Sequence, residues 1–135
     1  MVEEILRLFP QYYNIFRRLL GSYNPDQILI LQAIRAHEGS LSRPVLCEQL
    51  GFDSKRAHYL INPLRMKGLI YTERTGREAT DEVTDKGNKE FEEIREMIKP
   101  YIKQVVSLMA DEEREALSRF LEKARLAIEK VFGNF

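Results

Sequence analysis

The sequence predicts a mainly helical (α+β) protein, a winged helix-turn-helix with long helices at both ends of the chain. Three observations lead to this fold class. Residues 41–70 contain two short apolar stripes separated by a glycine turn, which is typical of a helix-turn-helix. A pair of strands with a glycine between them follows at residues 69–83. Residues 2–20 and 85–132 carry long amphipathic repeats, which predict terminal helices too long for a unit of this size to cover.

Composition sets the outer limits of this prediction. With 135 residues, 44% of them apolar, the chain can bury one hydrophobic core. It has no run of about 18 uncharged apolar residues, so we expect no membrane helix and no membrane partner. The first ten residues carry acids where a secretory signal carries bases. Because the single cysteine, Cys47, also fits a reducing compartment, we expect a cytoplasmic protein.

The first helix is expected over residues 2–20, with apolar side chains on more than one of its faces. A helix of this kind needs cover from several directions. Its aromatic residues Tyr12, Tyr13 and Phe16 are candidates to line a ligand pocket. The alternative is that they form a dimer core, which is the commoner role of aromatic residues at helical spacing.

The second helix has the best-marked start in the chain. Asn24 occupies the N-cap, Pro25 the first helical position and Gln27 the third, as in a capping box. The helix is nearly all apolar on its inner side and ends at Gly39. We therefore expect it to be the buried centre of the fold.

A short extended bridge at residues 40–42 leads into the helix-turn-helix. Ser42 is expected to cap the next helix, and Gly51 to end that helix in a left-handed conformation. Asp53 is then placed to cap the second helix of the pair. Two apolar stripes face each other across the turn: Val45, Leu46 and Leu50 on one helix, and Ala57, Leu60, Ile61 and Leu64 on the other.

Proline interrupts the second helix of the pair. Pro63 has no N–H to donate to the Tyr59 carbonyl, so we expect this helix to bend or shorten after Asn62.

The same helix is expected to present an exposed face that is rich in hydrogen-bond donors and free of acids. This face consists of Ser54, Lys55, Arg56, His58, Tyr59 and Asn62. The whole chain has no net charge, but residues 41–77 hold seven basic and three acidic residues, a net charge of +4, and residues 78–135 have a net charge of −4. Such a concentration of positive charge favours binding of nucleic acid at this face. The alternative is a solvated helix face with no partner.

The wing is expected to consist of a strand over residues 69–73, a three-residue loop and a return strand over residues 77–83. A loop of Arg74, Thr75 and Gly76 pairs Glu73 with Arg77 and puts the glycine in the left-handed position. Arg74 then lies at the tip. Three acids follow on the return strand: Glu78, Asp81 and Glu82.

Two long helices are expected to complete the chain. Thr84 caps the first, over residues 85–109, which should bend at Pro100. The last begins with the acidic turn 111–113 and runs to Gly133. Because the terminal helices exceed what the central unit can cover, we predict a homodimer. The predicted division is 1–24 (dimerisation helix), 25–87 (winged helix-turn-helix) and 88–135 (dimerisation helices).

In this order of elements, the chain resembles the MarR (multiple antibiotic resistance regulator) family of winged-helix transcription factors. The resemblance covers nearly the whole chain, and the segments that carry it are PDQILILQAI, LSRPVLCEQLGFDSKRAHYLINPLRMKGLI, VTDKG and MADEEREALSRFLEK. It implies a homodimer with interlocked terminal helices. It also implies that the helix over residues 54–67 enters the major groove, that the wing reaches the minor groove, and that a small ligand binds between the dimer helices and the DNA-binding unit.

The function expected from these features is sequence-specific binding of double-stranded DNA by a transcriptional regulator, a repressor acting on a palindromic operator. The residues expected to contact DNA are Ser42, Arg43, Ser54, Lys55, Arg56, His58, Tyr59, Asn62, Arg74 and Arg77. Lys55 and Arg56 would contact phosphate or guanine, and Tyr59 and Asn62 would read bases. A small-molecule effector is a further expected partner.

The alternative function is a dimeric winged-helix adaptor that has lost DNA binding, which Pro63 and the acidic wing strand would permit. An enzyme is not expected, because the sequence has no catalytic pair, nucleophile with its base, or phosphate-binding glycine loop. We expect no cofactor and no metal site, since His37 and His58 are isolated. Cys47 is expected to be a buried structural thiol, and His37 to be exposed at a helix end.

Overall fold

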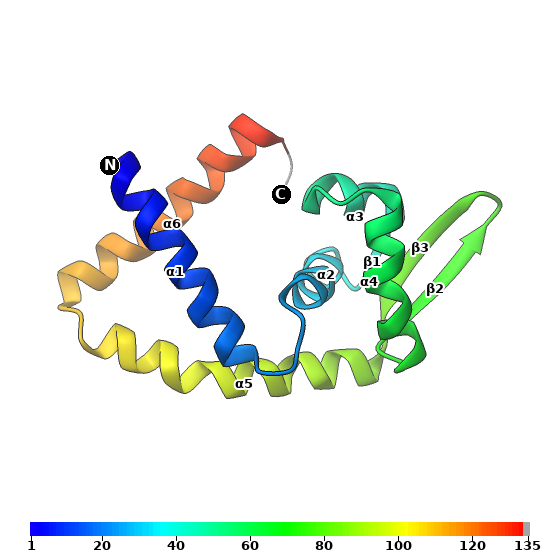
Figure 1. Ribbon diagram of the computed structural model, residues 1–135, viewed down its shortest axis with the longest axis horizontal. Coiled ribbons are helices and arrows are strands. Elements are labelled where there is room, and N and C mark those ends of the chain that lie inside the picture. Colours follow the sequence, from blue (N-terminus) through cyan, green and yellow to red (C-terminus); the bar gives the residue numbers. More distant parts are fainter. Residues whose placement is uncertain (134–135) are drawn as a thin grey trace.

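Residues 1–133 are described in the computed structural model, and they form six helices and three strands (Figure 1). The helices are α1 (Val2–Leu20), α2 (Pro25–Ala36), α3 (Arg43–Leu50), α4 (Ser54–Met66), α5 (Asp85–Ser107) and α6 (Asp111–Phe132). The strands are β1 (Ser40–Ser42), β2 (Ile70–Thr75) and β3 (Glu78–Val83). The predicted fold class, a mainly helical winged helix-turn-helix with long terminal helices, is confirmed.

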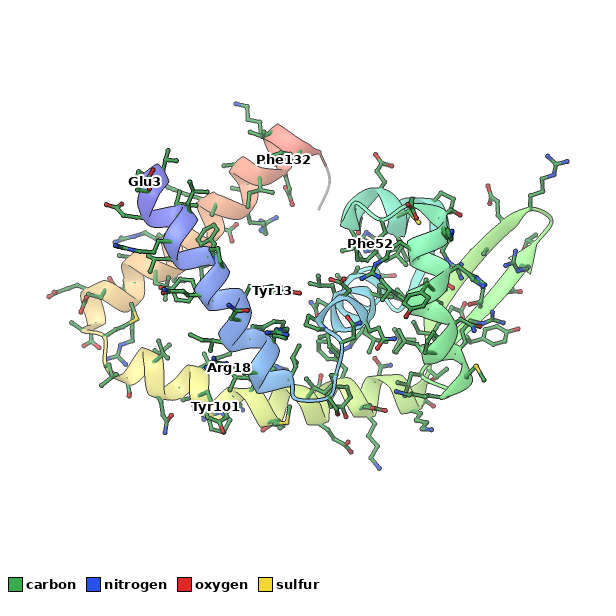
Figure 2. All side chains as sticks on the ribbon, in the orientation of Figure 1. Glu3, Tyr13, Arg18, Phe52, Tyr101 and Phe132 are labelled. Carbon is green, nitrogen blue, oxygen red and sulfur yellow. The ribbon has the colours of Figure 1, made fainter. Side chains whose placement is uncertain are left out.

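The centre of the core is α2, as predicted. Ile30 and Ile34 have no exposed surface, and α3, α4 and the sheet pack around this helix. Phe52 packs against the core from the corner between α3 and α4 (Figure 2). The buried core consists of Leu20, Ile28, Ile30, Leu31, Ile34, Leu41, Leu46, Ala57, Leu60, Ile61, Leu64, Leu69, Ile70 and Ile94.

The start of α2 differs from the expected capping box. The Asn24 side chain accepts a hydrogen bond from the Asp26 N–H at 2.9 Å, as an N-cap should. Gln27 does not reach back to Asn24, however. Its side-chain N–H donates to the Leu60 carbonyl at 3.1 Å, so the expected capping role of Gln27 is wrong and the residue ties α2 to α4 instead.

The turn between α3 and α4 has the predicted geometry. Gly51 is left-handed, with φ 68° and ψ 26°, and the Asp53 carboxylate accepts from the Arg56 N–H at 2.7 Å. Ser42 occupies the N-cap position of α3, but its side chain makes no capping hydrogen bond. Its backbone is held in β1 opposite Thr80, and the expected capping by its hydroxyl is therefore wrong.

Pro63 does not shorten α4. The helix continues to Met66, and Leu64, directly after the proline, is buried. Packing of this last turn against the core explains why the helix persists beyond Asn62, and the expected shortening is wrong. Pro63 has no N–H to donate to the Tyr59 carbonyl. At the next residue, Gln27 of α2 donates to the Leu60 carbonyl, so this part of α4 receives a hydrogen bond from a neighbouring helix.

The strands form one antiparallel sheet in the order β1-β3-β2. The expected extended bridge is thus a third strand. The predicted register of the wing is wrong, because Ile70 pairs with Val83 and Thr75 with Glu78, leaving a two-residue loop of Gly76 and Arg77. Gly76 has φ 66°, the left-handed conformation that such a tight hairpin needs.

The helix α5 spans the molecule from the base of the wing to the turn before α6 (Figure 1). It runs through Pro100 in a gentle curve without a break. Thr84 caps it, accepting from the Gly87 N–H at 3.0 Å, as predicted. Among the described residues, α6 has no buried side chain and α1 has only Leu20, so the chain leaves most apolar residues of both helices exposed.

Candidate nucleic-acid interface

One face of α4 is free of cover within the chain. Ala57, Leu60, Ile61 and Leu64 are buried, and this fixes which side chains point outward. The six residues predicted for the outer face are all exposed: Ser54, Lys55, Arg56, His58, Tyr59 and Asn62. Every one of them carries a group that can contact a phosphate or a base edge.

The hairpin places two more basic residues beside this face. A hollow of about 550 Å³ lies between the start of α4 and the wing. Six of the ten predicted contact residues line it, namely Arg43, Ser54, Lys55, His58, Arg74 and Arg77, together with Pro44, Glu78 and Ala79. Glu78 is the single acid in this lining, and Lys55, Arg74 and Arg77 have no ion pair within residues 1–133, so the hollow suits an anionic backbone.

Arg43 occupies the floor of the hollow, where a buried carboxylate binds it. Its Nε and Nη2 donate to the two oxygens of Asp81 at 2.6 and 2.7 Å, and Thr72 Oγ1 donates to Asp81 at 2.7 Å. The Arg43 side chain is 13% exposed and that of Asp81 is 0% exposed. The hydrogen bond with Asp81 raises the pKa of Arg43 against the effect of its burial. Arg43 thus joins α3 to the sheet, and Asp81 is an internal acid, not a surface acid of the wing.

Arg56 is also tied to an acid, at the opposite edge of the α4 face. Its Nη2 donates to the Asp26 carboxylate, on the first turn of α2, at 2.8 Å. The guanidinium carbon lies 6.0 Å from the centre of the Tyr59 ring. The side chains of Arg56 and Asp26 remain 45% and 28% exposed, so the ion pair lies at the surface.

The remaining predicted contacts are arranged differently. Arg74 and Arg77 are exposed on the wing and have no ion pair within residues 1–133. Ser42 is half-buried in β1, outside the hollow. The Asn62 side chain lies 4.0 Å from Met66 Sδ, one turn further along α4.

A second hollow, of about 500 Å³, lies where α1, α2 and α5 meet. Of the three aromatic residues proposed for a ligand pocket, Phe16 lines it, whereas Tyr12 and Tyr13 do not and are exposed. The other lining residues are Ile28, Leu29, Gln32, Phe91, Ile94, Arg95, Ile98, Lys99, Ile102 and Lys103.

The basic residues of this second hollow were not among the residues predicted from the sequence. Each of its three basic residues directly follows an isoleucine of α5 that also lines the hollow: the pairs are Ile94-Arg95, Ile98-Lys99 and Ile102-Lys103, in which Ile94 is buried, Ile98 half-buried and Ile102 exposed. This spacing of four residues puts the basic side chains in one row beside the apolar stripe. Basic residues repeated every four positions beside an apolar stripe are therefore the sequence pattern that indicates these three residues.

A polar link joins α2 to α5 beside this hollow. Arg35 donates to Glu92 at 2.7 Å, and its guanidinium lies 4.1 Å from the centre of the Phe91 ring. The hydrogen bond from Arg35 lowers the pKa of Glu92. This contact connects α2, at the centre of the core, to the long helix α5.

Two other reactive side chains, Cys47 and His37, line neither of these hollows. Cys47 is half-buried, and this burial raises the pKa of its thiol, which fits a packed thiol. His37 is exposed at the end of α2, as expected, with one ring nitrogen 3.0 Å from the Ala33 carbonyl and the other 3.1 Å from the Gln49 amide.

Residues 1–133 contain no group of three or more His, Cys, Asp or Glu that could hold a metal. None of the helices in this range has the length and apolar character needed to cross a membrane.

Solved MarR-type proteins have a similar fold. A MarR family protein from Bacillus stearothermophilus gives a TM-score of 0.80 at 23% identity, covering 94% of this chain and 92% of that chain. A MarR transcriptional regulator from Methanosarcina mazei Go1 gives 0.78 at 18% identity, covering 95% and 92%. The PcaV transcriptional regulator from Streptomyces coelicolor, solved in complex with its natural ligand, gives 0.66 at 20% identity, covering 87% and 86%. No protein-family model matches the sequence, and no curated protein does. The chain therefore has the fold of these regulators.

Proposed function

We propose that this chain is a MarR-type transcriptional regulator, a repressor that binds double-stranded DNA in a sequence-specific way. The observation that carries the proposal is the exposed face of α4, which has no acid of its own, beside a hollow lined by Lys55, Arg74 and Arg77, none of them in an ion pair within residues 1–133. In the helix-turn-helix geometry, such a face enters the major groove while flanking basic residues contact phosphates. Lys55 and His58 lie between the α4 face and the hollow, so they are positioned for both kinds of contact.

The regulator would act as a homodimer on a palindromic operator. The exposed apolar side chains of α1, the end of α5 and α6 support this proposal, because one chain alone leaves these helices without cover. Two copies of α4 would then lie about one helical turn of DNA apart, roughly 34 Å. The predicted division into residues 1–24, 25–87 and 88–135 is part of this proposal.

A small effector would bind in the hollow between α1, α2 and α5. Its walls are formed by apolar residues such as Phe16, Ile94 and Ile98, and Arg95, Lys99 and Lys103 add positive charge along one side. The chemistry that fits is a small apolar molecule with an acidic group.

The adaptor alternative has less support than the sequence suggested. Asp81, one of the three acids of the wing strand, is buried and paired with Arg43. Pro63 leaves α4 continuous to Met66. Pro63 therefore no longer favours an adaptor, and the acidic strand favours it less, because Glu78 is the one acid of the strand that lines the hollow.

Selection of bound duplexes from a random pool tests the proposed function. We expect a palindromic product whose half-sites are centred about 10 base pairs apart. With that duplex, K55A should weaken binding and reduce the slope of log K against log salt by about 0.9, the value for the loss of one phosphate contact. K123A, on the exposed surface of α6, should change neither the affinity nor the slope. If no duplex is enriched and none is bound at low salt, the DNA-binding function is wrong and the adaptor remains.

A further inference from the structure

The contact between Arg56 and Asp26 raises a question about specificity. Arg56 is the third helical residue of α4, on the face proposed to meet DNA, yet its Nη2 is bonded to a carboxylate 30 residues earlier in the chain. Asp26 belongs to α2 and lies in its first turn. The carboxylate is thus a fixed feature of the edge of the candidate interface.

The pair leaves most of the guanidinium available. One N–H of Arg56 donates to Asp26 at 2.8 Å, and its other four N–H groups make no hydrogen bond within the described chain, although the guanidinium also lies 6.0 Å from the centre of the Tyr59 ring. The side chain is 45% exposed, so these donors are accessible to a ligand. The adjacent carboxylate, however, cancels the net charge of the group.

Cancelling the charge affects two kinds of contact differently. A phosphate is drawn to a guanidinium by charge, and a carboxylate at 2.8 Å repels the same phosphate. The O6 and N7 atoms of guanine are neutral acceptors, which attract N–H groups without requiring a net positive charge. Asp26 therefore disfavours phosphate contact by Arg56 much more than base contact.

We propose that Asp26 is a specificity-determining residue, which restrains Arg56 from sequence-independent phosphate contact and reserves its free N–H groups for a base edge. The inference rests on the proposed DNA-binding function. It assigns a role in recognition to a residue of α2, outside the helix-turn-helix, and it explains why an acid lies next to the α4 face.

The test uses D26N in the full-length chain and a duplex of fixed random sequence. Affinity is measured between about 50 and 200 mM salt, the range in which phosphate contacts dominate. We expect D26N to bind this duplex on the order of two- to fivefold more tightly, the worth of one exposed ion pair, and to steepen the slope of log K against log salt by roughly 0.9. On the selected operator the gain should be smaller, so the ratio of specific to nonspecific affinity falls.

A matched control separates the contact from the change in net charge. E48Q removes the same charge from an exposed residue of α3 that makes no ion pair within residues 1–133, and it should leave the salt slope unchanged. The double variant D26N/R56A should behave as R56A alone, because the released charge belongs to Arg56. D26S removes the carboxylate by a different substitution and serves if D26N unfolds.

Three results would overturn the inference. D26N could have the same nonspecific affinity and salt slope as E48Q. D26N/R56A could still bind the random duplex more tightly than R56A, or the ratio of specific to nonspecific affinity could be the same for D26N and the wild type. In each case the wild type still binds duplex DNA, so the proposed function stands and only the role of Asp26 is lost. Absence of binding by the wild type at low salt is a separate result, and it removes both.

Discussion

Asp81 is a completely buried acid, and its carboxylate therefore depends on partners inside the fold. Arg43 supplies two hydrogen bonds and Thr72 a third, so both carboxylate oxygens are satisfied. A buried ion pair gains little over apolar packing, but it makes each partner dependent on the other. Arg43 also lines the hollow beside α4, and the pair therefore sets the position of the wing relative to that helix.

Removing one partner of this pair should be costly. We expect D81A to lower the free energy of unfolding by about 3–5 kcal/mol, because the Arg43 guanidinium is then buried without a counter-charge. The double variant R43M/D81L should recover most of the loss. Denaturant unfolding monitored by circular dichroism measures both.

E82A is the control for this prediction. Glu82 is the next residue of β3 and points to the other face of the sheet, so its loss should have little effect. A D81A variant as stable as E82A would show that the Arg43 charge does not need Asp81.

The sequence predicts that Asp81 lies on the buried face of β3, but it does not predict the partner of Asp81. Ala79, Asp81 and Val83 alternate along β3, and the period of two puts Asp81 on the same face as two apolar residues. Its partner could not be found in this way. Arg43 comes 38 residues earlier, and only the pairing of β1 with β3 brings the two together. The ion pair of Arg56 with Asp26 was missed for the same reason.

At the scale of elements, the junction of β2 and α5 depends on a close approach. Thr84 donates its hydroxyl to the Gly68 carbonyl at 2.6 Å and accepts from Gly87, which fixes the first turn of α5 against the sheet. A Cβ at Gly87 would lie 2.2 Å from the Leu69 carbonyl oxygen and 2.9 Å from a Val83 methyl. The helix can lie this close to Leu69, just before β2, and to Val83 of β3 only because residue 87 has no side chain.

G87A should therefore separate α5 from the sheet. We expect a loss of about 1–3 kcal/mol of unfolding free energy, as in other overpacked sites, although alanine is the better helix former. Thermal unfolding measures the effect. K89A, an exposed position two residues further along α5, should be nearly neutral, and a G87A variant more stable than the wild type would contradict the close approach.

The helices could be predicted to within a few residues, whereas the wing register could not. Periodicity and caps such as Asn24, Asp53 and Thr84 act locally, so they can be recognised in sequence. The register depends on which strand residues share the buried face. It was chosen from charge pairing at the loop, but the pairing of Ile70 with Val83 determines it.

At the scale of the whole molecule, the uncovered face of α6 is the main sign of a second chain. Apolar residues recur along this helix at Leu117, Leu121 and Ile128, all exposed in the single chain. We expect the wild type to have twice the mass of one chain in solution, and L121D to shift it toward monomer, because an aspartate in a dimer core is desolvated without a partner. Light scattering after gel filtration measures the mass.

L126D is the matched control for the dimer. Leu126 is also exposed on α6, but five residues from Leu121 it faces the other side of the helix. The same substitution there should leave the mass unchanged. Equal effects at both positions, or a monomeric wild type, would contradict the predicted interface.

The unbroken course of α5 through Pro100 has a mechanical consequence. With 23 residues in one piece, the helix is about 34 Å long, and a tilt of about 5° near Gly87 displaces its other end by about 3 Å. A small rotation at the start of α5, beside the wing, therefore moves its far end, where the apolar side chains are exposed, by a larger distance. In the proposed dimer, a change of angle small enough to keep the Arg35 to Glu92 contact would produce a larger change in the distance between the two α4 helices.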